Sequence, residues 1–293
     1  MLSILIPTYN FPCISLVQNL CDQAIGAGII FEIIVVDDCS LEEWKLENRA
    51  IHAISHCKFI ELESNIGPAR TRNYLAEKAA YPYLLYLDAD TMPAGNTFIE
   101  KYLTNIQSGS VICGGLKYKR HKPSADSALR YYYGISAEER TVPQREEMPY
   151  QRFISMNFLI PKSVFMENKF NETFHLGYED TFWGKQLEEN KVPVIHIDNP
   201  VYHEAFESSE QFLWKTRRAV KNLIGHEQEL QSHVRLLRMY FSISRWKLDK
   251  PALALFRLTE KLIVKNLTGA HPSMTLFAFY KLGYLCRYRT EAL

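Results

Sequence analysis

The sequence predicts an α/β protein with a Rossmann-like, mostly parallel central sheet flanked by helices, followed by a C-terminal helical extension. Short apolar runs alternate with helix-like segments over about the first 115 residues. These runs are continuously apolar, as in strands that are buried on both faces, and the helical patterns between them have the length of parallel βαβ crossovers. With 293 residues, 47% of them hydrophobic, we expect a domain at 1–205 and an extension at 206–293.

The elements are expected in the following order. The first five strands lie at 2–7, 31–38, 58–62, 83–90 and 110–118, and the helices between them at 12–26, 42–55, 67–79 and 95–107. The polar stretch from Lys117 to Gln151 is interpreted as a mobile loop that serves as a lid. The core resumes with 153–161, a turn at 175–180, a helix at 180–190, strands at 192–198 and 201–204, and helices from Glu207 onward.

Charge and cysteine usage narrow the class of protein. Residues 1–205 hold 19 Lys and Arg against 26 Asp and Glu, whereas 206–293 hold 15 against 7. A basic extension suits an anionic membrane or nucleic acid, but a solvated helical face is the favoured interpretation and no nucleic-acid partner is expected.

Six scattered cysteines without a C-x-x-C pair argue against a zinc knuckle or a disulfide framework. With no apolar run of about 18 residues, we expect a cytoplasmic protein, soluble or peripheral.

Polar residues follow three of the expected strands. The strand ends read "PTYN" (7–10), Asp37-Asp38 and Asp88-Ala89-Asp90. The carboxyl ends of parallel strands meet at one edge, where such sheets bind ligands. Two carboxylates projecting to one side of a strand end suit Mg²⁺ or Mn²⁺ carrying phosphate oxygens. Taken alone the D-x-D pattern is a weak signal, and turn capping is the alternative.

The two segments next to these strand ends allow structural and functional interpretations. We expect Asp38 to contact a ligand and Asp37 or Ser40 to cap the following helix or turn. In "NIGPARTRN" (65–73), Pro68 suits the first position of a helix. Arg70 and Arg72 then lie in its first turns, where cations oppose the helix dipole, so they indicate an anionic partner unless they are surface arginines.

A second acidic pair and a histidine complete the set of candidate residues. Glu179 and Asp180 in "GYEDTFW" (177–183) are either helix caps or a general base with its partner, beside Tyr178 and Trp183 as an aromatic platform for a sugar ring. His203 in "VYHE" is a candidate third metal ligand, although a lone histidine is more often structural.

Taken in order, "SILIPTYN", "EIIVVDDCS", "NIGPARTRN", "YLLYLDADTMP", "GYEDTFWGKQL" and "VYHE" resemble the family 2 glycosyltransferases of the GT-A fold. That family includes the catalytic domains of bacterial polysaccharide polymerases and the polypeptide GalNAc-transferases. The resemblance spans about residues 2–205. It implies transfer of a sugar from a nucleoside-diphosphate sugar, with UDP the expected nucleotide, to a hydroxyl of a saccharide or lipid-linked saccharide, with Mn²⁺ or Mg²⁺ as cofactor.

The resemblance also implies a role for each matching residue. The nucleotide would be enclosed by Pro7, Thr8, Tyr9, Asn10 and Asp38, with Asn65, Gly67 and Arg72 closing around it. The metal would be bound by Asp90 and His203, and Asp88 would lie near the ribose and the metal. Asp180 would be the catalytic base, and Glu179 would orient the acceptor, which Tyr178 and Trp183 would contact. The chain lacks the Q-x-x-R-W motif and the membrane spans of processive members. A single transfer with inversion at the anomeric carbon is therefore expected.

Parts of the sequence also resemble other classes of protein. The pattern "LDADT" also resembles the D-x-D-x-T loop of haloacid-dehalogenase-type phosphatases, but those chains open with that strand and here it is the fourth. A sugar nucleotidyltransferase would need a glycine-rich, basic loop where this chain has "PTYNFP". A non-enzymatic binding module would not need the second acidic pair. The segment 275–289, which mixes aromatic and basic residues, either packs against the catalytic domain or lies on the inner face of the cell membrane beside a lipid-linked acceptor.

Overall fold

The computed structural model describes residues 1–121, 123–174 and 177–291. It divides into two compact units: the first comprises Met1–Lys119, Glu139–His175 and Phe182–Ala205, and the second Arg120–Glu138, Leu176–Thr181 and Phe206–Leu293. The expected extension from residue 206 is thus joined by two earlier segments, and the division at 205/206 stays a prediction. Residue 122 of the expected loop, 175–176 of the expected turn and 292–293 of the extension lie outside the described residues.

A seven-stranded sheet forms the first unit. In sheet order its strands are β3 (Cys57–Glu61), β2 (Phe31–Asp37), β1 (Leu2–Thr8), β4 (Tyr83–Leu87), β8 (Asn157–Pro161), β6 (Val111–Cys113) and β9 (Val194–His196). All neighbours pair in parallel except β8, which is antiparallel to β4 and β6. The predicted mostly parallel sheet is confirmed, and its order places β2, β1 and β4 side by side.

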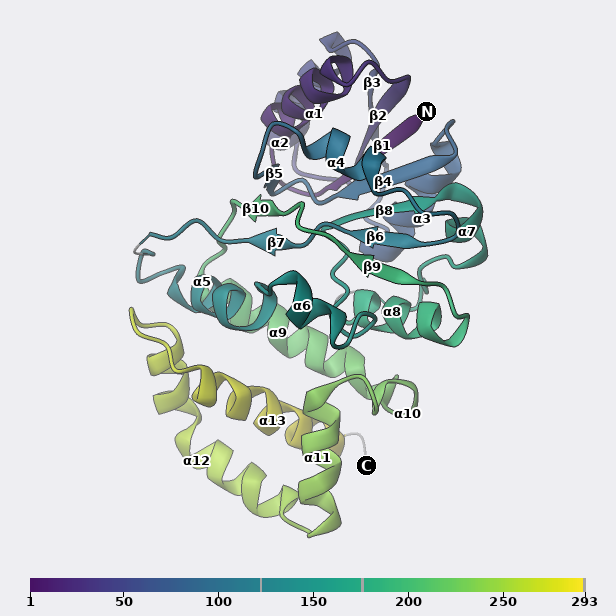
Figure 1. The fold of residues 1–293 in the computed structure, drawn as a ribbon. Helices are drawn as coiled ribbons and strands as arrows, with labels where there is room; N and C mark the ends of the chain where they lie inside the picture. Colours follow the sequence, from purple (N-terminus) through teal and green to yellow (C-terminus); the bar gives the residue numbers. More distant parts are fainter. Residues whose placement is uncertain (122, 175–176, 292–293) are drawn as a thin grey trace. The chain divides into compact units, whose positions relative to one another are not determined.

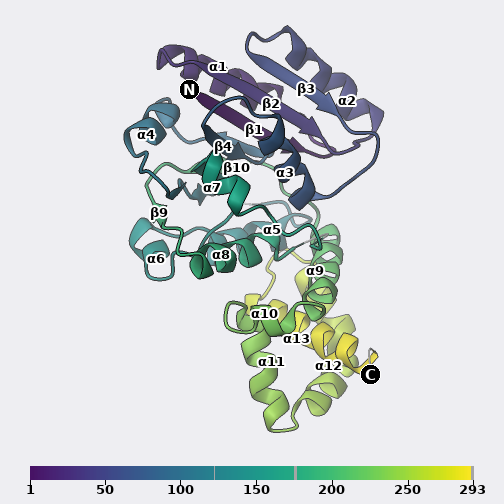
Figure 2. The same ribbon diagram turned by 90° about the vertical axis from the view of Figure 1, so that its right-hand side faces the viewer.

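Helices cover both faces of this sheet (Figures 1 and 2). One face carries α1 (Ile14–Gly26), α2 (Glu42–Asn48) with the 3₁₀ turn Arg49–Ala53, and α4 (Phe98–Thr104); the other carries α3 (Pro68–Lys78), α7 (Lys162–Glu167) and the part of α8 (Glu179–Glu189) that belongs to this unit. Between the sheet and the second group lies a core rich in aromatic rings, with Tyr86 stacked on Phe158 at 4.8 Å. This buried apolar surface holds the strand ends in place.

A second sheet of three short strands was not predicted. It joins β5 (Thr91–Pro93), β10 (Val201–His203) and β7 (Leu116–Lys117), with β10 in the middle, antiparallel to β5 and parallel to β7. The expected strand at 110–118 is therefore two strands, β6 and β7, in different sheets. Gly114 lies between them, where an added Cβ would be 2.3 Å from the carbonyl oxygen of Asn199, so the chain can turn from one sheet to the other only with glycine here.

The interpretation of 117–151 as a mobile loop is corrected by the structure. The segment contains α5 (Ala128–Tyr133), the π-helical turn Gly134–Glu138 and α6 (Val142–Glu146). In the first unit, Arg145 of α6 is 6% exposed and donates to the carbonyl oxygens of Cys113 (3.1 Å) and Ile197 (2.9 Å). An arginine buried in this way anchors α6 to the strands β6 and β9, because its donors would otherwise lose their hydrogen bonds to water.

The second unit is helical, as predicted for residues from 207 onward. Its helices are α5, α9 (Ser209–Ile224), α10 (Glu227–Leu230), α11 (Arg235–Arg245), α12 (Asp249–Leu267) and α13 (Met274–Glu291). Helix α13 contacts α9, α11 and α12. Its residues Phe277, Tyr280 and Tyr284 are buried, so the segment 275–289 packs inside this helical unit and does not offer its aromatic side to a membrane. No helix within residues 1–121, 123–174 and 177–291 is long and apolar enough to cross a membrane.

Candidate active site

The polar residues after β1, β2 and β4 meet at one edge of the sheet, because these strands are neighbours and parallel. Thr8 is in register with Asp37, and the backbone N–H of Asp38 donates to the carbonyl oxygen of Thr8 at 2.9 Å. Asp88 follows directly after β4. The structure therefore brings together the first three polar clusters that the sequence predicted.

The "PTYN" turn is fastened to the end of β2. Asn10 has a positive φ of 51°, its N–H donates to Ser40 Oγ at 2.7 Å, and its own Oδ1 accepts from the N–H of Leu41 at 2.8 Å. Thr8 Oγ1 donates to the carbonyl oxygen of Phe11. These bonds leave the ring of Tyr9, which is 56% exposed, as the prominent surface of the turn. Pro7 precedes it, half-buried.

Asp37 holds the next turn without capping a helix. Its Oδ1 accepts from the N–H of Ser40 at 2.8 Å, whereas α2 begins after Leu41, whose side chain makes no cap. Asp37 thus caps a turn, which is one of the two roles expected for it. The expected helix cap by Asp37 or Ser40 is not formed.

Asp38 fixes the loop before α3. Its two carboxylate oxygens accept the N–H groups of Ile66 (2.7 Å) and Gly67 (2.9 Å), and Asn65 Nδ2 donates to its carbonyl oxygen at 2.9 Å. Gly67, at φ 86°, then starts the helix with Pro68 in its first turn, as predicted. Burial raises the pKa of Asp38 above its ordinary value, although the two N–H donors oppose this shift. Each oxygen has a further lone pair, so the carboxylate can also accept from a ligand.

Arg72 and Asp88 form an ion pair between α3 and the end of β4. Arg72 Nη2 donates to Asp88 Oδ1 at 2.8 Å, and the two side chains are 5% and 23% exposed. The guanidinium also lies 5.5 Å from the centre of the Phe170 ring. Arg70, by contrast, is exposed and 3.4 Å from Glu172. Of the two arginines expected to meet an anion, only Arg72 lies at the strand ends.

Asp90 and His203 are brought together by the second sheet. In the β5 and β10 pair His203 is opposite Thr91, and the N–H of Glu204 donates to the carbonyl oxygen of Asp90 at 2.9 Å. As a result, Asp90 Oδ2 lies 3.2 Å from His203 Nε2, with the two side chains 31% and 4% exposed. A carboxylate and an imidazole separated by 113 residues in the sequence thus face each other.

This pair fits a divalent metal as part of a coordination shell. Two ligand atoms at adjacent corners of an octahedral ion, each about 2.1 Å from it, lie about 3 Å apart, close to the distance between Asp90 Oδ2 and His203 Nε2. Within the part of the chain that the structure describes, no three His, Cys, Asp or Glu side chains form a metal cluster. Asp88, expected as a further ligand, accepts from Arg72 with one oxygen, and its role as a metal ligand stays a prediction. Mg²⁺ and similar ions commonly take one or two protein ligands and fill the shell with substrate phosphates and water.

Two residues near His203, Tyr118 and Lys119, were missed by the sequence analysis. The ring of Tyr118 lies 5.7 Å from the imidazole of His203, and Lys119 Nζ donates to Glu204 Oε1 at 2.6 Å. Lys119 also lies 5.4 Å from the ring of Tyr202. They come from the segment interpreted as a loop, and only the pairing of β7 with β10 places them here.

The second acidic pair belongs to the other unit. Glu179 and Asp180 are the first residues of α8, where the helix dipole favours ionised carboxylates, and Asp180 Oδ1 accepts from the N–H of Thr181 at 2.7 Å. Tyr178 before them has φ 68°, an unfavourable conformation for a bulky residue. Burial raises the pKa of Tyr178, and the nearby Tyr133 and Asp180 add to this, so its hydroxyl stays protonated at neutral pH.

Close packing supports this turn within the second unit. An added Cβ on Gly177 would lie 2.7 Å from the Cβ of Ala219, and Asn222 Nδ2 donates to the carbonyl oxygen of Gly177 at 3.2 Å. Both partners belong to α9. The strained turn before the acidic pair is therefore held by a helix that lies later in the sequence.

Trp183 is not an aromatic platform. Its side chain is 0% exposed in the core of the first unit, where it stacks on Phe170 at 4.7 Å and its indole N–H donates to the carbonyl oxygen of Asn168. Trp183 lies one helical turn before Leu187, which is buried in the same core, so this face of α8 points inward. A ring without an exposed face cannot contact an acceptor, and the predicted role of Trp183 is corrected.

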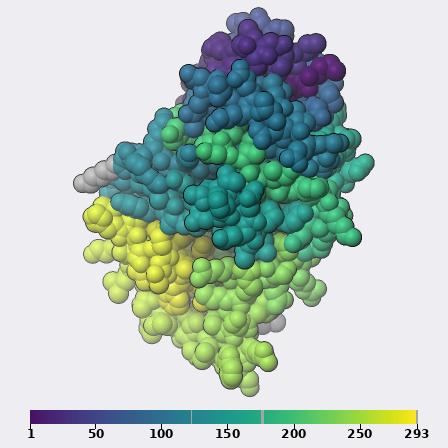
Figure 3. All heavy atoms as spheres, viewed as in Figure 1, coloured from purple at the N-terminus to yellow at the C-terminus, as the bar shows by residue number. Residues whose placement is uncertain are grey.

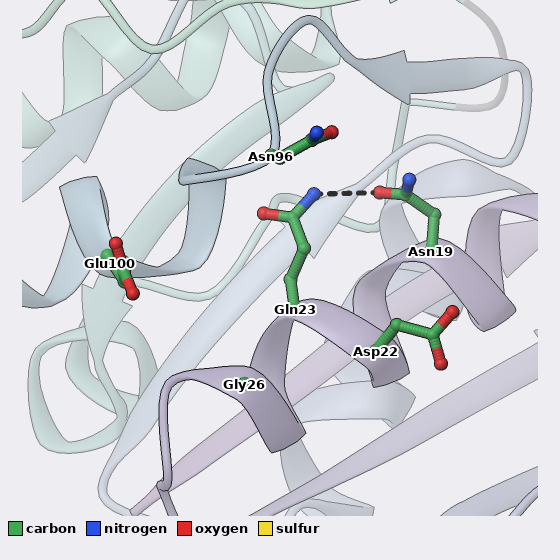
Figure 4. Close-up of a pocket in the computed structure, with 6 residues that line it drawn as sticks. All are labelled: Asn19, Asp22, Gln23, Gly26, Asn96 and Glu100. Atoms are coloured by element: carbon green, nitrogen blue, oxygen red, sulfur yellow. Dashed lines mark hydrogen bonds between the residues drawn. The ribbon is translucent and has the colours of Figure 1, made fainter.

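A polar depression of about 410 Å³ lies elsewhere on the first unit (Figure 4). It is lined by Asn19, Asp22, Gln23, Gly26, Asn96 and Glu100. Gln23 of α1 bridges to α4, since its Oε1 accepts from the N–H of Phe98, and its Nε2 donates to Asn19 within α1. The carboxyl end of β1 leads into the start of α1, so the end of α1 lies toward the opposite edge of the sheet. The depression is thus separate from the site built by the strand ends.

Comparisons with known proteins identify the family of the chain. The family model described as Glycosyl transferase family 2 matches residues 3–173, more than half of the chain, and ends before Glu179. An uncharacterized glycosyltransferase from Haemophilus influenzae is 36% identical over 92 residues. That match covers 31% of this chain and 29% of the relative, less than a third of either protein.

Solved structures share the fold. A mannosyltransferase from Pyrobaculum calidifontis, PcManGT, in complex with GDP-Man and Mn²⁺, has a TM-score of 0.59 at 12% identity, covering 99% of this chain and 86% of that one. TarS 1–349 from S. aureus in complex with UDP-GlcNAc has a TM-score of 0.54 at 18% identity, covering 99% and 91%. At such identities the likeness concerns the fold, and that fold is GT-A.

Proposed function

Because the chain belongs to glycosyl transferase family 2, we propose that it transfers one sugar, with inversion, from a nucleoside-diphosphate sugar to a hydroxyl of a saccharide or lipid-linked saccharide. The observation that carries the proposal is the Asp90 and His203 pair at 3.2 Å, beside the Arg72 and Asp88 ion pair at the strand ends. Parallel sheets bind nucleotides at this edge. Solved structures with the same fold contain UDP-GlcNAc or GDP-Man with Mn²⁺, and this supports a nucleotide sugar as the donor.

The nucleotide would lie between the β1 and β2 turns. The exposed ring of Tyr9 offers a stacking surface for a base, and the Asp38 carboxylate can accept from a base N–H with its second lone pairs. Asn65 and Gly67 are fixed by Asp38, and Arg72 is fixed by Asp88. These contacts fix the positions of the residues before a ligand arrives, so little ordering is needed on binding. UDP is the proposed nucleotide.

Asp90 and His203 would hold the divalent metal, with Mn²⁺ the proposed ion. When bound, such an ion offsets the negative charge that grows on the leaving diphosphate. Asp90 directly precedes β5 and His203 ends β10, and these two strands are paired, so backbone hydrogen bonds set the separation of the two residues. This anchoring orients both ligands before the donor binds.

Asp180 is the proposed general base and Glu179 the residue that orients the acceptor. The acceptor oxygen forms a bond to the anomeric carbon, the bond from that carbon to the diphosphate oxygen breaks, and the acceptor proton passes to the Asp180 carboxylate. A positioned base contributes about 10²–10⁴-fold to such a step. The N-terminal position of Asp180 in α8 favours its ionised form, as a base requires.

The donor is identified by a thermal-shift panel of UDP, GDP and dTDP sugars, each with and without Mn²⁺. A ligand that binds the folded protein raises its melting temperature by mass action. We expect a UDP-sugar with Mn²⁺ to give the largest shift. No shift with any nucleotide sugar, with or without metal, would remove the basis of the proposal.

The base is tested by Asp180→Asn, with Glu188→Gln on the exposed side of the same helix as the matched control. We expect the Asp180 variant to bind the donor as tightly as wild type and to release UDP from it at least 100-fold more slowly when acceptors are present. Wild-type turnover in Asp180→Asn rejects the assignment. Equal loss in the control would indicate damage to the helix rather than to the chemistry.

A further inference from the structure

Helix α12 is apolar on two different sides. One side carries Leu253, Phe256, Ile263 and Leu267, which are all buried and pack inside the helical unit. An added Cβ on Gly283 of α13 would lie 2.2 Å from Phe256 Cγ, so α13 approaches this side closely. The inner side is thus fully used by the fold, and it does not account for the apolar residues on the other side.

The second side is a stripe of exposed apolar residues, called the outer stripe below. It consists of Leu248, Pro251, Leu255, Leu258 and Leu262, which alternate at spacings of three and four residues and therefore lie in one row. The leucines are 51%, 53%, 83% and 70% exposed in that order. Trp246, in the turn just before α12, is 76% exposed. Single exposed apolar residues are ordinary, but a continuous row of this kind marks an interaction surface.

The exposed charges nearest to the outer stripe along α12 are basic. Between residues 245 and 267 the exposed charged side chains are Arg245, Lys247, Lys250, Arg257, Lys261 and Lys265. The acids in this range, Asp249 and Glu260, are half-buried, and Glu260 accepts from Arg287 and from the hydroxyl of Tyr284. At about 100° per residue, Lys265 lies about 60° and Lys261 about 100° around the helix from the centre of the stripe, whereas Asp249 and Arg257 lie about 140° and Glu260 about 160° from it. Figure 3 shows the side chains of α11 and α12, lime to yellow-green, on the surface.

The charges decide between occupants of this surface. A second copy of the chain packed on the same stripe would bring the lysines of one helix against those of the other, and like charges this close repel. Apolar side chains with a tryptophan and flanking Lys and Arg are instead typical of helices that lie in the interface of an anionic bilayer. We propose that the outer stripe of α12, with Trp246, binds the surface of membranes that contain anionic phospholipids. Membrane binding by the outer stripe would not depend on the donor site.

The proposal is tested by flotation of the full chain with vesicles of phosphatidylcholine alone and of phosphatidylcholine with 30% phosphatidylserine. We expect binding to the anionic vesicles that weakens as salt is raised. Two variants probe the surface: Leu258→Ser with Leu262→Ser, and Lys261→Gln with Lys265→Gln. Near an anionic surface each lysine contributes about 1 kcal/mol, so the lysine variant should bind about 25-fold more weakly. The leucine variant should lose at least 10-fold.

Matched controls carry the same changes on the first unit. Leu41 and Leu46 are 62% and 61% exposed and are changed to Ser, and the exposed Lys78 and Lys191 are changed to Gln. The controls should bind as wild type does, and circular dichroism and melting temperature should show that all variants fold. Absence of wild-type binding, equal loss in the controls, or wild-type binding by both α12 variants overturns the proposal. So does a dimer in solution that the Leu258 and Leu262 changes abolish while vesicle binding is absent.

Discussion

His196 should make the protein lose stability at mildly acidic pH. It is 3% exposed on β9, with Nδ1 3.0 Å from Nη1 of Arg145 and Nε2 3.0 Å from the carbonyl oxygen of Pro149. The guanidinium can only donate, so Nδ1 must accept and Nε2–H must donate to Pro149, which requires a neutral ring. Burial, reinforced by the charge of Arg145, lowers the pKa of His196 to about 4.

The sign and size of the effect follow from this lowered pKa. In the unfolded chain a histidine has a pKa of about 6.5, so below that pH the unfolded chain takes up a proton that the folded protein excludes until about pH 4. The free energy of unfolding therefore falls as the pH falls through this window, by about 3 kcal/mol in total. His196→Gln keeps one acceptor and one donor but does not titrate, so it lacks this loss.

The assay is urea unfolding of wild type and His196→Gln at pH 7, 6, 5 and 4, followed by circular dichroism. Other groups titrate equally in both proteins, so the difference between the two curves isolates His196. We expect the free energy of unfolding of the variant, relative to wild type, to rise by about 3 kcal/mol from pH 7 to pH 4. A difference that stays constant over this range would refute the buried neutral imidazole. The consequence for function is that protonation would loosen β9, which leads directly to the strand that carries His203.

Two further predictions concern the packing of the helical unit and the metal site. Gly283→Ala should lower the melting temperature, because the new Cβ would lie 2.2 Å from Phe256 Cγ and overpacking costs about 1–3 kcal/mol. The control Gly26→Ala has open space around its Cβ position and should not lower the melting temperature. Equal melting temperatures of the two variants would contradict the close approach of α12 and α13. His203→Gln should weaken Mn²⁺ binding at least 10-fold in a calorimetric titration, with His226→Gln as control, and unchanged Mn²⁺ affinity would exclude His203 as a ligand.

The strand ends could be predicted from the sequence because their signal is local. Asp38 and Asp88 each follow a continuous apolar run, and the topology rule for parallel sheets then places them at one edge. The meeting of Asp90 with His203 is different, since it depends on two three-residue strands that pair across the chain. The family resemblance suggested that Asp90 and His203 act together. Because strands this short have no periodicity of their own, the sequence could not predict how close the two side chains lie.

Burial of single side chains was the least predictable property. Trp183 was interpreted as an aromatic platform beside the acidic pair, although its spacing to Leu187 is that of a buried helix face. Arg145 and His196 gave no signal, because a buried arginine in a polar segment looks like any surface arginine. The composition of α12 and α13 indicated apolar and basic residues on both helices. Only the structure shows that α13 is buried against Phe256 inside the helical unit, whereas the outer stripe of α12 is exposed.

The central claim is that the strand ends bind a metal and a nucleoside diphosphate together through Asp90. The most direct measurement is calorimetric titration of UDP into wild type and Asp90→Asn, each with and without Mn²⁺. We predict that Mn²⁺ strengthens UDP binding at least 10-fold in wild type and has no such effect in Asp90→Asn, while binding without metal is the same in both. Equal strengthening by Mn²⁺ in the two proteins would contradict the claim.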